Sequence, residues 1–304
     1  MKRDFLAIPD FSQEEIKETF QVARDLKNKV KTGEVHHLLQ GQTLAMVFAK
    51  PSARTRVSFE VGMYQLGGHA IYLSPNDIGI GTRESVADVA RVLARYNNGI
   101  MARLFAHAHI VELAEYSDVP VINGLTDLLH PCQVMGDILT IIEHKDQIEG
   151  QKVCYVGDGN NLANSWLNAA SMLPFTLHLA CPEGYDPDQK ILENAKNAGL
   201  SEIKIFRDAK EAVQGVDVIY ADVWASMGQE KEAQERKKIF MPLQVNEELV
   251  AQADDNCVVM HCLPAHRGDE ITDGVMDGPH SIVFDEAENR LHIQKAIMVK
   301  LMVK

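Results

Sequence analysis

Residues Thr43–Leu73 read TLAMVFAKPSARTRVSFEVGMYQLGGHAIYL, and they contain one complete strand–helix–strand unit. The first seven residues are an apolar run that predicts a strand. After Ser52, apolar residues recur at helical spacing at Phe59, Met63 and Leu66, and this predicts a helix that ends at the glycine pair. The last five residues predict a second strand, so the unit indicates a parallel sheet.

The same alternation continues on both sides of this unit. Further strands are expected at 99–104, 119–123, 152–156, 175–181, 216–220 and 257–261. Helices are expected at 84–96, 110–116, 135–142 and 161–172. A first helix is expected between the capping box Ser12–Glu15 and Gly33, and a last helix follows a second capping box, Asp285–Glu288, and runs through Leu301.

The length and charge of the chain limit the classes of protein it can belong to. Its 304 residues predict two domains at about 150 residues each, with the boundary just after the helix that ends near His144. The net charge of −13 argues against a nucleic-acid binder and against docking on an anionic membrane surface. No apolar run approaches the ~18 residues of a membrane-spanning helix, and we expect no signal peptide. Five cysteines at scattered spacings favour reduced thiols in the cytoplasm.

Residues 50–60 form a candidate anion site. A predicted strand, a loop and a helix N-terminus follow one another, and the N–H groups at a helix N-terminus attract negative charge. Ser52 and Thr55 add hydroxyl donors, and Arg54 adds a planar fork that suits phosphate. An ordinary helix cap with solvated arginines is the alternative, but the density of cationic and hydroxyl groups favours the anion site.

Three other strand ends carry polar residues where ligands of α/β sheets bind. His130-Pro-Cys-Gln133 follows one strand, and its histidine is as compatible with a structural role as with a catalytic one. The segment 156–162 reads VGDGNNL, which lacks the third glycine of the dinucleotide fingerprint, so a nicotinamide cofactor is disfavoured and its asparagines suggest recognition of a small polar molecule. Asp222 follows another strand, where its carboxylate can bind an amine.

The cysteines and histidines leave several interpretations open. Cys262 follows the last strand and is either a reactive thiol or a small buried residue. His36-His37 and the pair His107 and His109 are interpreted as solvent-facing, because no neighbouring residues complete a metal site. We therefore expect neither a metal nor a cofactor.

Taken together, these motifs resemble the aspartate/ornithine carbamoyltransferase family, most closely its ornithine branch. The resemblance covers residues 5–302. It is carried by Ser52-Ala-Arg-Thr-Arg56, His130-Pro-Cys-Gln133, Asp222 with Ser226-Met227-Gly228, His261-Cys-Leu-Pro264 and Glu288-Asn-Arg-Leu-His292.

The resemblance implies a carbamoyl-phosphate-binding domain at 1–145, joined by a C-terminal helix, 286–304, that packs back on it, and an ornithine-binding domain at 146–285. It implies transfer of the carbamoyl group of carbamoyl phosphate to the δ-amine of L-ornithine, giving L-citrulline and phosphate. This is a step of arginine biosynthesis. A homotrimer with active sites at the subunit interfaces is also implied.

The family's site residues can be transferred to matching positions of this chain. Those implied for carbamoyl phosphate are Ser52, Ala53, Arg54, Thr55, Arg103, His130, Pro131, Cys132, Gln133, Cys262, Leu263 and Arg290. Those implied for ornithine are Asn161, Asp222, Ser226 and Met227, with Asp222 and Cys262 nearest the reacting amine. A cis peptide bond before Pro264 is expected, because it follows a strand and turns the Leu263 carbonyl toward the substrate.

Two positions depart from the family pattern. Ala53 replaces a common threonine, and Gly79 replaces a glutamine that reaches phosphate from the neighbouring subunit, a role that Thr82 or Arg83 can take over. Three rival functions remain: a sibling transferase that uses putrescine or N-acetylornithine, a dinucleotide-dependent oxidoreductase, and a non-catalytic ligand-binding paralogue.

Overall fold

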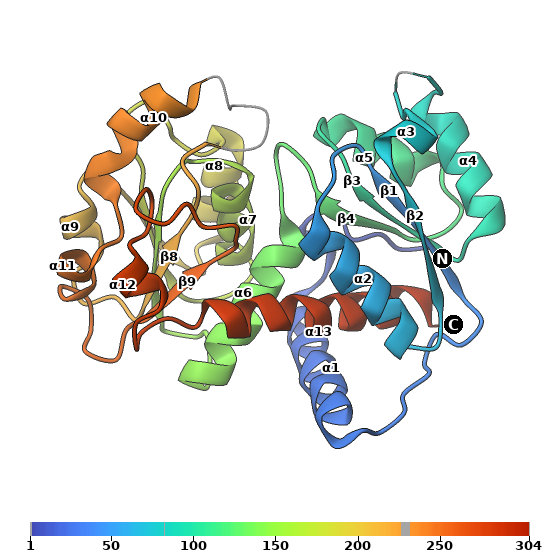
Figure 1. The fold of residues 1–304 in the computed structure, drawn as a ribbon, viewed down its shortest axis with the longest axis horizontal. Coiled ribbons are helices and arrows are strands. Elements are labelled where there is room, and N and C mark those ends of the chain that lie inside the picture. The colour runs from blue at the N-terminus through green and yellow to red at the C-terminus, as the bar shows by residue number, and fades with distance from the viewer. Residues whose placement is uncertain (1, 82, 226–231, 304) are drawn as a thin grey trace. The chain divides into compact units, whose positions relative to one another are not determined.

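The computed structural model describes residues 2–81, 83–225 and 232–303, and the chain forms two compact units. The first unit comprises Met1–Leu139 and Asn289–Lys304, and the second comprises Thr140–Glu288. Each unit is built around its own parallel sheet flanked by helices (Figure 1). The α/β class and the organisation into two parallel sheets are therefore confirmed.

The first unit holds a four-stranded sheet with the strand order β2-β1-β3-β4, and all of its neighbouring strands are parallel. The strands are β1 (Thr43–Phe48), β2 (His69–Leu73), β3 (Gly99–Arg103) and β4 (Val121–Leu125). The helices are a 3₁₀ turn (Ile8–Asp10), α1 (Gln13–Thr32), α2 (Ala53–Gln65), α3 (Pro75–Ile78), α4 (Val86–Tyr96) and α5 (His107–Tyr116). Two further helices, α6 (Pro131–Lys145) and α13 (Val283–Met302), each contribute to both units.

Helices cover both faces of this sheet. The alternate residues Ala45, Val47, Ile100 and Ala102 pack against apolar side chains of α4 and α5. Helices α2 and α13 pack against each other, since a Cβ atom added at Gly62 would lie 3.1 Å from the Met298 side chain.

The C-terminal helix returns to the first unit, as expected. The Lys27 ammonium of α1 donates to Asn289 Oδ1 of α13 at 2.8 Å. The expected capping box at Asp285–Glu288 is wrong, because α13 already begins at Val283. The reason is tertiary: Asp285 Oδ2 lies 2.9 Å from His144 Nε2, and the Glu286 carboxylate accepts from the Tyr220 hydroxyl.

The second unit holds a five-stranded parallel sheet with the order β7-β6-β5-β8-β9. The strands are β5 (Lys152–Val156), β6 (Thr176–Ala180), β7 (Glu202–Phe206), β8 (Val218–Ala221) and β9 (Val258–His261). The helices are α7 (Asn161–Ala170), α8 (Gln189–Ala198), α9 (Ala209–Ala212), α10 (Ala233–Phe240), a 3₁₀ turn (Met241–Leu243), α11 (Glu247–Val250) and α12 (Asp273–Met276).

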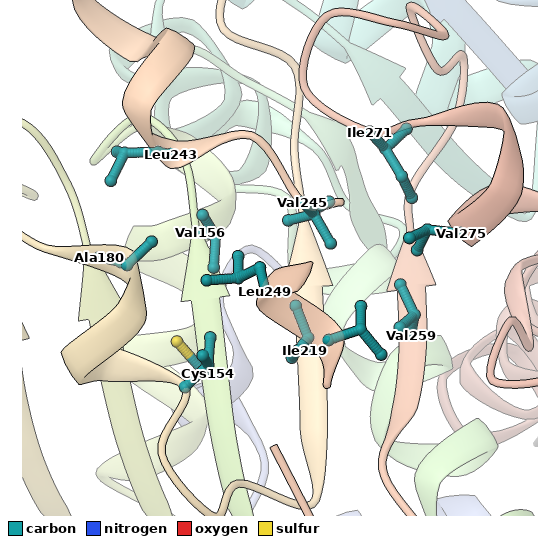
Figure 2. Packing of buried hydrophobic residues seen from close by; sticks show 14 of the residues in the cluster. Cys154, Val156, Ala180, Ile219, Leu243, Val245, Leu249, Val259, Ile271 and Val275 are labelled. Atoms are coloured by element: carbon teal, nitrogen blue, oxygen red, sulfur yellow. The ribbon is translucent and has the colours of Figure 1, made fainter. Parts of the chain in front are cut away.

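The side chains of these strands point alternately to the two faces of the sheet, and both faces are buried. One face carries Val156, Ile219 and Val259, which pack beneath apolar residues of the 241–250 and 271–275 segments (Figure 2). The opposite face carries Tyr155 and Tyr220, whose rings stack with centroids 6.0 Å apart. The sheet is therefore apolar on both sides, as parallel sheets usually are.

Strands β4, β7 and β8 differ most from the expectation, and β8 begins at Val218 and not at 216. Strand β4 begins at Val121 and not at 119, because Pro120 has no N–H group to donate to the ladder. Strand β7 was not predicted; it pairs only with β6 and mixes polar with apolar residues along one sheet edge. Among the described residues, no helix is long and apolar enough to cross a membrane.

Candidate active site

The expected site residues gather where the strand order of each sheet changes direction. In the first unit β1 lies between β2 and β3, and in the second unit β5 lies between β6 and β8. Ligands of α/β sheets bind beyond the strand ends at such points. Ser52 and Thr55 follow β1 and Arg103 ends β3, while Asp222 follows β8 and Cys262 follows β9.

The first unit forms a cluster of buried cationic side chains around Thr55. The Thr55 hydroxyl accepts hydrogen bonds from Arg103 Nη1 and Arg290 Nη2, each at 3.2 Å. Thr55 is fully buried, and the two arginines are 6% and 5% exposed. Ser52 caps helix α2, and its hydroxyl lies 3.1 Å from that of Thr55. We call Ser52, Thr55, Arg103, His130 and Arg290 the arginine cluster.

Electrostatics in this cluster favour an anion. Burial, followed by the charges of Arg290 and Arg103, lowers the pKa of His130 well below its ordinary value. The imidazole is therefore neutral at physiological pH, and the two guanidinium groups supply the positive charge. They lie beside the N-terminus of α2, whose N–H groups add to the positive potential.

The residues of the motif 130–133 have different surroundings. Gln133 Nε2 donates to Asp137 Oδ1 at 2.7 Å, which orients the glutamine amide. The Cys132 thiol donates to the Asn123 carbonyl at 3.3 Å, and burial raises its pKa to about 12. Cys132 is thus an unreactive buried thiol, and Pro131 is the first residue of α6.

Ala53 and Arg54 lie in the first turn of α2, and both are exposed, in contrast to the buried arginines. The expectation that His36 and His107 face solvent is wrong. His36 is 8% exposed, and its Nε2 accepts from the Lys295 ammonium at 2.8 Å. His107 is half-buried, with Nδ1 2.9 Å from the Thr126 hydroxyl.

In the second unit, the Asp222 carboxylate is the centre of a hydrogen-bond network. It is 3% exposed. Its Oδ1 accepts from the Val223 N–H at 2.8 Å and from the Cys262 thiol at 3.2 Å. Its Oδ2 accepts from the Tyr155 hydroxyl at 2.9 Å and from Asn160 Nδ2 at 2.8 Å. The fold therefore brings Asp222 and Cys262 together, as expected, and adds Tyr155, which sequence analysis missed.

A buried ion pair beside Asp222 was also missed. Arg236 of α10 donates to the Asp158 carboxylate and to the Trp224 carbonyl. Its guanidinium also lies over the Tyr185 ring, 4.8 Å from the centroid. Burial raises the pKa of Asp158 to about 6, against the opposing effect of Arg236. Nothing local in the sequence pairs these residues, which are 78 positions apart.

The backbone after β9 has the expected cis bond between Leu263 and Pro264. His261 is buried, its Nε2 lies 3.0 Å from Glu270 Oε1, and its Nδ1 accepts from the Leu263 N–H at 2.9 Å. The Leu263 backbone is thus held by a side chain of the preceding strand.

Five other positions named in the sequence analysis remain, two of them among the described residues. Asn161 is the first residue of α7, directly after the cap residue Asn160. Gly79 ends α3 with φ +52°, a left-handed conformation that glutamine would adopt only under strain. Ser226 and Met227 lie outside the described residues, as does Thr82.

Comparisons with known proteins place the chain in a family. The sequence profile of the aspartate/ornithine carbamoyltransferase carbamoyl-P binding domain matches residues 3–143, and that of the Asp/Orn binding domain matches residues 149–301. The chain belongs to the aspartate/ornithine carbamoyltransferase family.

Its relatives narrow this class to the ornithine branch. The chain is 55% identical over 298 residues to the ornithine carbamoyltransferase of Syntrophus aciditrophicus, which covers 98% of this chain and 99% of that protein. It is 54% identical to the chloroplastic ornithine carbamoyltransferase of Pisum sativum over 99% of this chain and 81% of that protein. The crystal structure of the Pyrococcus furiosus ornithine carbamoyltransferase matches with a TM-score of 0.94 and 51% identity, covering 99% of this chain and 97% of that chain. The expected resemblance is confirmed.

Proposed function

We propose that this chain transfers the carbamoyl group of carbamoyl phosphate to the δ-amine of L-ornithine, giving L-citrulline and phosphate, a step of arginine biosynthesis. The observation that carries the proposal is the convergence of Arg103 and Arg290 on Thr55 at the N-terminus of α2. Two buried guanidinium groups beside a helix N-terminus suit the phosphate group of an acyl phosphate such as carbamoyl phosphate. The relatives named ornithine carbamoyltransferase support the choice of substrates.

The first unit is the carbamoyl-phosphate-binding domain. Phosphate is held by the hydroxyls of Ser52 and Thr55, the backbone of Ala53, and the guanidinium groups of Arg54 and Arg290. Arg103, His130 and Gln133 hold the carbamoyl group, and Pro131 and Cys132 contribute backbone only, since the Cys132 thiol is engaged with Asn123.

The second unit is the ornithine-binding domain. Asn161 and the backbone around Ser226 and Met227 hold the α-carboxylate, and Asp222 holds the α-amine. The Leu263 carbonyl accepts from the carbamoyl NH₂ group, and the Cys262 thiol lies near the reacting amine. Support for these roles comes from the motifs and from the bond between Cys262 and Asp222.

The reaction needs a neutral amine and stabilisation of negative charge. The δ-amine resembles a lysine amine with a pKa near 10.4, so the site must favour its neutral form, which desolvation and cationic neighbours do. Attack on the carbonyl carbon forms the C–N bond and develops negative charge on the carbamoyl oxygen. Phosphate then leaves with the electron pair of the broken C–O bond and takes up the proton that the amine loses. The Arg103 guanidinium and the neutral His130 are preorganised donors for the oxygen.

Citrulline-type assays with three amines test the proposal. Putrescine lacks the α-carboxylate, and N-acetylornithine lacks the charged α-amine that Asp222 binds. Sites with buried polar partners reject such analogues, so kcat/KM for L-ornithine exceeds that for either analogue by at least ~10³. The Asp222→Asn substitution is expected to reduce the difference in kcat/KM between L-ornithine and N-acetylornithine. Comparable rates with putrescine would reassign the chain to the sibling transferases.

The assembly is a homotrimer that buries an apolar face of the first unit. Val57, Val61 and Tyr64 follow one another along one face of α2 and are 55%, 36% and 80% exposed, and Ile71 of the neighbouring β2 is 40% exposed. A second copy of the chain covers this face and places active sites at the interfaces. Tyr64→Glu is expected to give monomers in sedimentation experiments, and an unchanged trimer would exclude this face.

The protein acts in the cytoplasm. Its five cysteines all lie in the described part of the chain and are free thiols, four of them buried, which suits a reducing compartment.

A further inference from the structure

The four groups that donate hydrogen bonds to the Asp222 carboxylate differ in donor strength. An ionised carboxylate offers about four lone-pair positions, and Tyr155, Asn160, Val223 and Cys262 each occupy one. The three donors other than Cys262 are a hydroxyl, an amide and a backbone N–H group. A thiol is the weakest donor of the four, and Cys262 is only half-buried. An incoming ammonium group therefore displaces Cys262 from Oδ1 most easily.

Two donors, Tyr155 and Asn160, hold the Oδ2 atom of Asp222 in place. The Asn160 amide cannot flip without loss, because its Oδ1 caps α7 by accepting from the Leu162 N–H at 2.8 Å. Its Nδ2 therefore faces Asp222. The Tyr155 hydroxyl has one proton and three acceptors within hydrogen-bond distance: the Asp158 carbonyl at 2.8 Å, Asp222 Oδ2 at 2.9 Å and Asn160 Oδ1 at 3.3 Å. The carboxylate is the strongest acceptor of the three.

The Tyr155 ring has little freedom to move away. It is fully buried on β5 and stacks on Tyr220 of the neighbouring strand at an interplanar angle of 18°. Tyr220 in turn meets the Trp166 ring edge-on at 5.7 Å. Burial, followed by the Asp222 charge, raises the pKa of Tyr155 well above its ordinary value, so the hydroxyl remains a donor.

We infer that Tyr155 is a positioning residue for the proposed reaction: its hydroxyl, with Asn160, fixes the Asp222 carboxylate by its Oδ2 edge and leaves Oδ1 for the α-amine of the substrate. The inference rests on the proposed role of Asp222 in ornithine binding. It makes substrate selectivity depend on a side chain that does not touch the substrate.

Tyr155→Phe tests this inference because it keeps the ring and removes one oxygen. The expected result is a roughly 10-fold rise in KM for ornithine, the scale of one hydrogen bond to a charged group. The inhibition constant of 2-aminopentanoate, which has the α-amine and α-carboxylate but no δ-amine, rises by a similar factor. KM for carbamoyl phosphate is unchanged.

Tyr220→Phe is the matched control. Tyr220 is equally buried in the same aromatic stack, but its hydroxyl donates to Glu286 Oε1 at 3.1 Å. It is expected to lower the melting temperature about as much as Tyr155→Phe while KM for ornithine stays within about 2-fold. Equal effects of both variants on both substrates would show a merely structural role and overturn the inference.

A second variant covers the case in which Tyr155→Phe is too unstable to assay. Asn160→Ser removes the other donor to Oδ2 and leaves a residue that still caps α7. It should raise the same two constants, and unchanged constants would overturn the inference. In the Asp222→Asn background, Tyr155→Phe should add little to the inhibition constant of 2-aminopentanoate, whereas a full additive effect would show that Tyr155 acts elsewhere.

The wild-type protein separates this inference from the proposed function. If it forms citrulline while Tyr155→Phe keeps the normal KM for ornithine, the inference fails and the proposed function stands. If it forms no citrulline but binds 2-aminopentanoate in calorimetry, and Tyr155→Phe weakens that binding, the function fails and the inference stands. If it does neither, both fail.

Discussion

The Thr55 hydroxyl contributes both to the stability of the fold and to the proposed binding of carbamoyl phosphate. Its hydroxyl is the common acceptor of Arg103 and Arg290, and all three side chains are buried. Thr55→Val keeps the shape and removes that acceptor. Valine also cannot donate a hydrogen bond to phosphate. We therefore expect both the free energy of unfolding and the affinity for carbamoyl phosphate to fall.

The magnitude follows from the geometry. Hydrogen bonds from charged donors contribute about 1.5–3 kcal/mol each, but both bonds here are 3.2 Å long, beyond the most favourable N···O distance. Partial compensation by water lowers the value further, so we expect a loss of about 2 kcal/mol, or a fall in Tm of roughly 3 °C for a chain of 304 residues. Loss of the donor to phosphate should raise KM for carbamoyl phosphate about 10-fold.

Thermal unfolding and steady-state kinetics measure the two effects on the same preparation. Thr19→Val is the control, because Thr19 is also buried and its hydroxyl donates to the Glu15 carbonyl within α1, away from the arginine cluster. The control should lower Tm without changing KM for carbamoyl phosphate. A Thr55→Val variant that loses stability but keeps the normal KM for carbamoyl phosphate would refute the assigned role.

Three further predictions address other residues. Arg54→Ala should lower kcat at least ~100-fold with little change in Tm, because Arg54 is exposed; a sharp fall in Tm with high residual activity would mark it as structural. Cys262→Ser should raise KM for ornithine and lower kcat without abolishing turnover, and trapping a carbamoylated Cys262 would overturn direct attack by the amine. Burial lowers the pKa of Lys295 from 10.5 to about 8, so the unfolded chain binds more protons between these values and stability should rise with pH there, by at most about 3 kcal/mol. Urea titrations at pH 7 to 10 check this rise, and Lys295→Met should flatten the curve.

The local sequence determined most of the elements. Ser12 and Ser52 cap α1 and α2 as expected, since a side-chain oxygen reaches an N–H group only three residues away. Strand β5 has the expected bounds because the four residues after Lys152 are buried and apolar on both faces. Where a nearby chemical feature was overlooked, as with Pro120 before β4, the error was two residues.

The candidate site could likewise be predicted only in part from the sequence. The motifs pointed to Thr55, Asp222 and Cys262 as site candidates, because their residue types follow strand ends in a parallel sheet, whereas Arg103 was expected only from the family resemblance. The resemblance to the carbamoyltransferases could be identified from the sequence, since motifs typical of that family occur along the whole chain.

Only the tertiary structure decided how these residues are paired. Tyr155 resembles any other apolar residue of a buried strand until the register of β5 against β8 brings its hydroxyl to Asp222. Asp158 and Arg236 are separated by 78 positions, and the burial of His36 depends on Lys295 of the returning C-terminal helix. Caps and strand patterns depend on neighbours within a few residues, whereas these contacts depend on which elements the packing brings together.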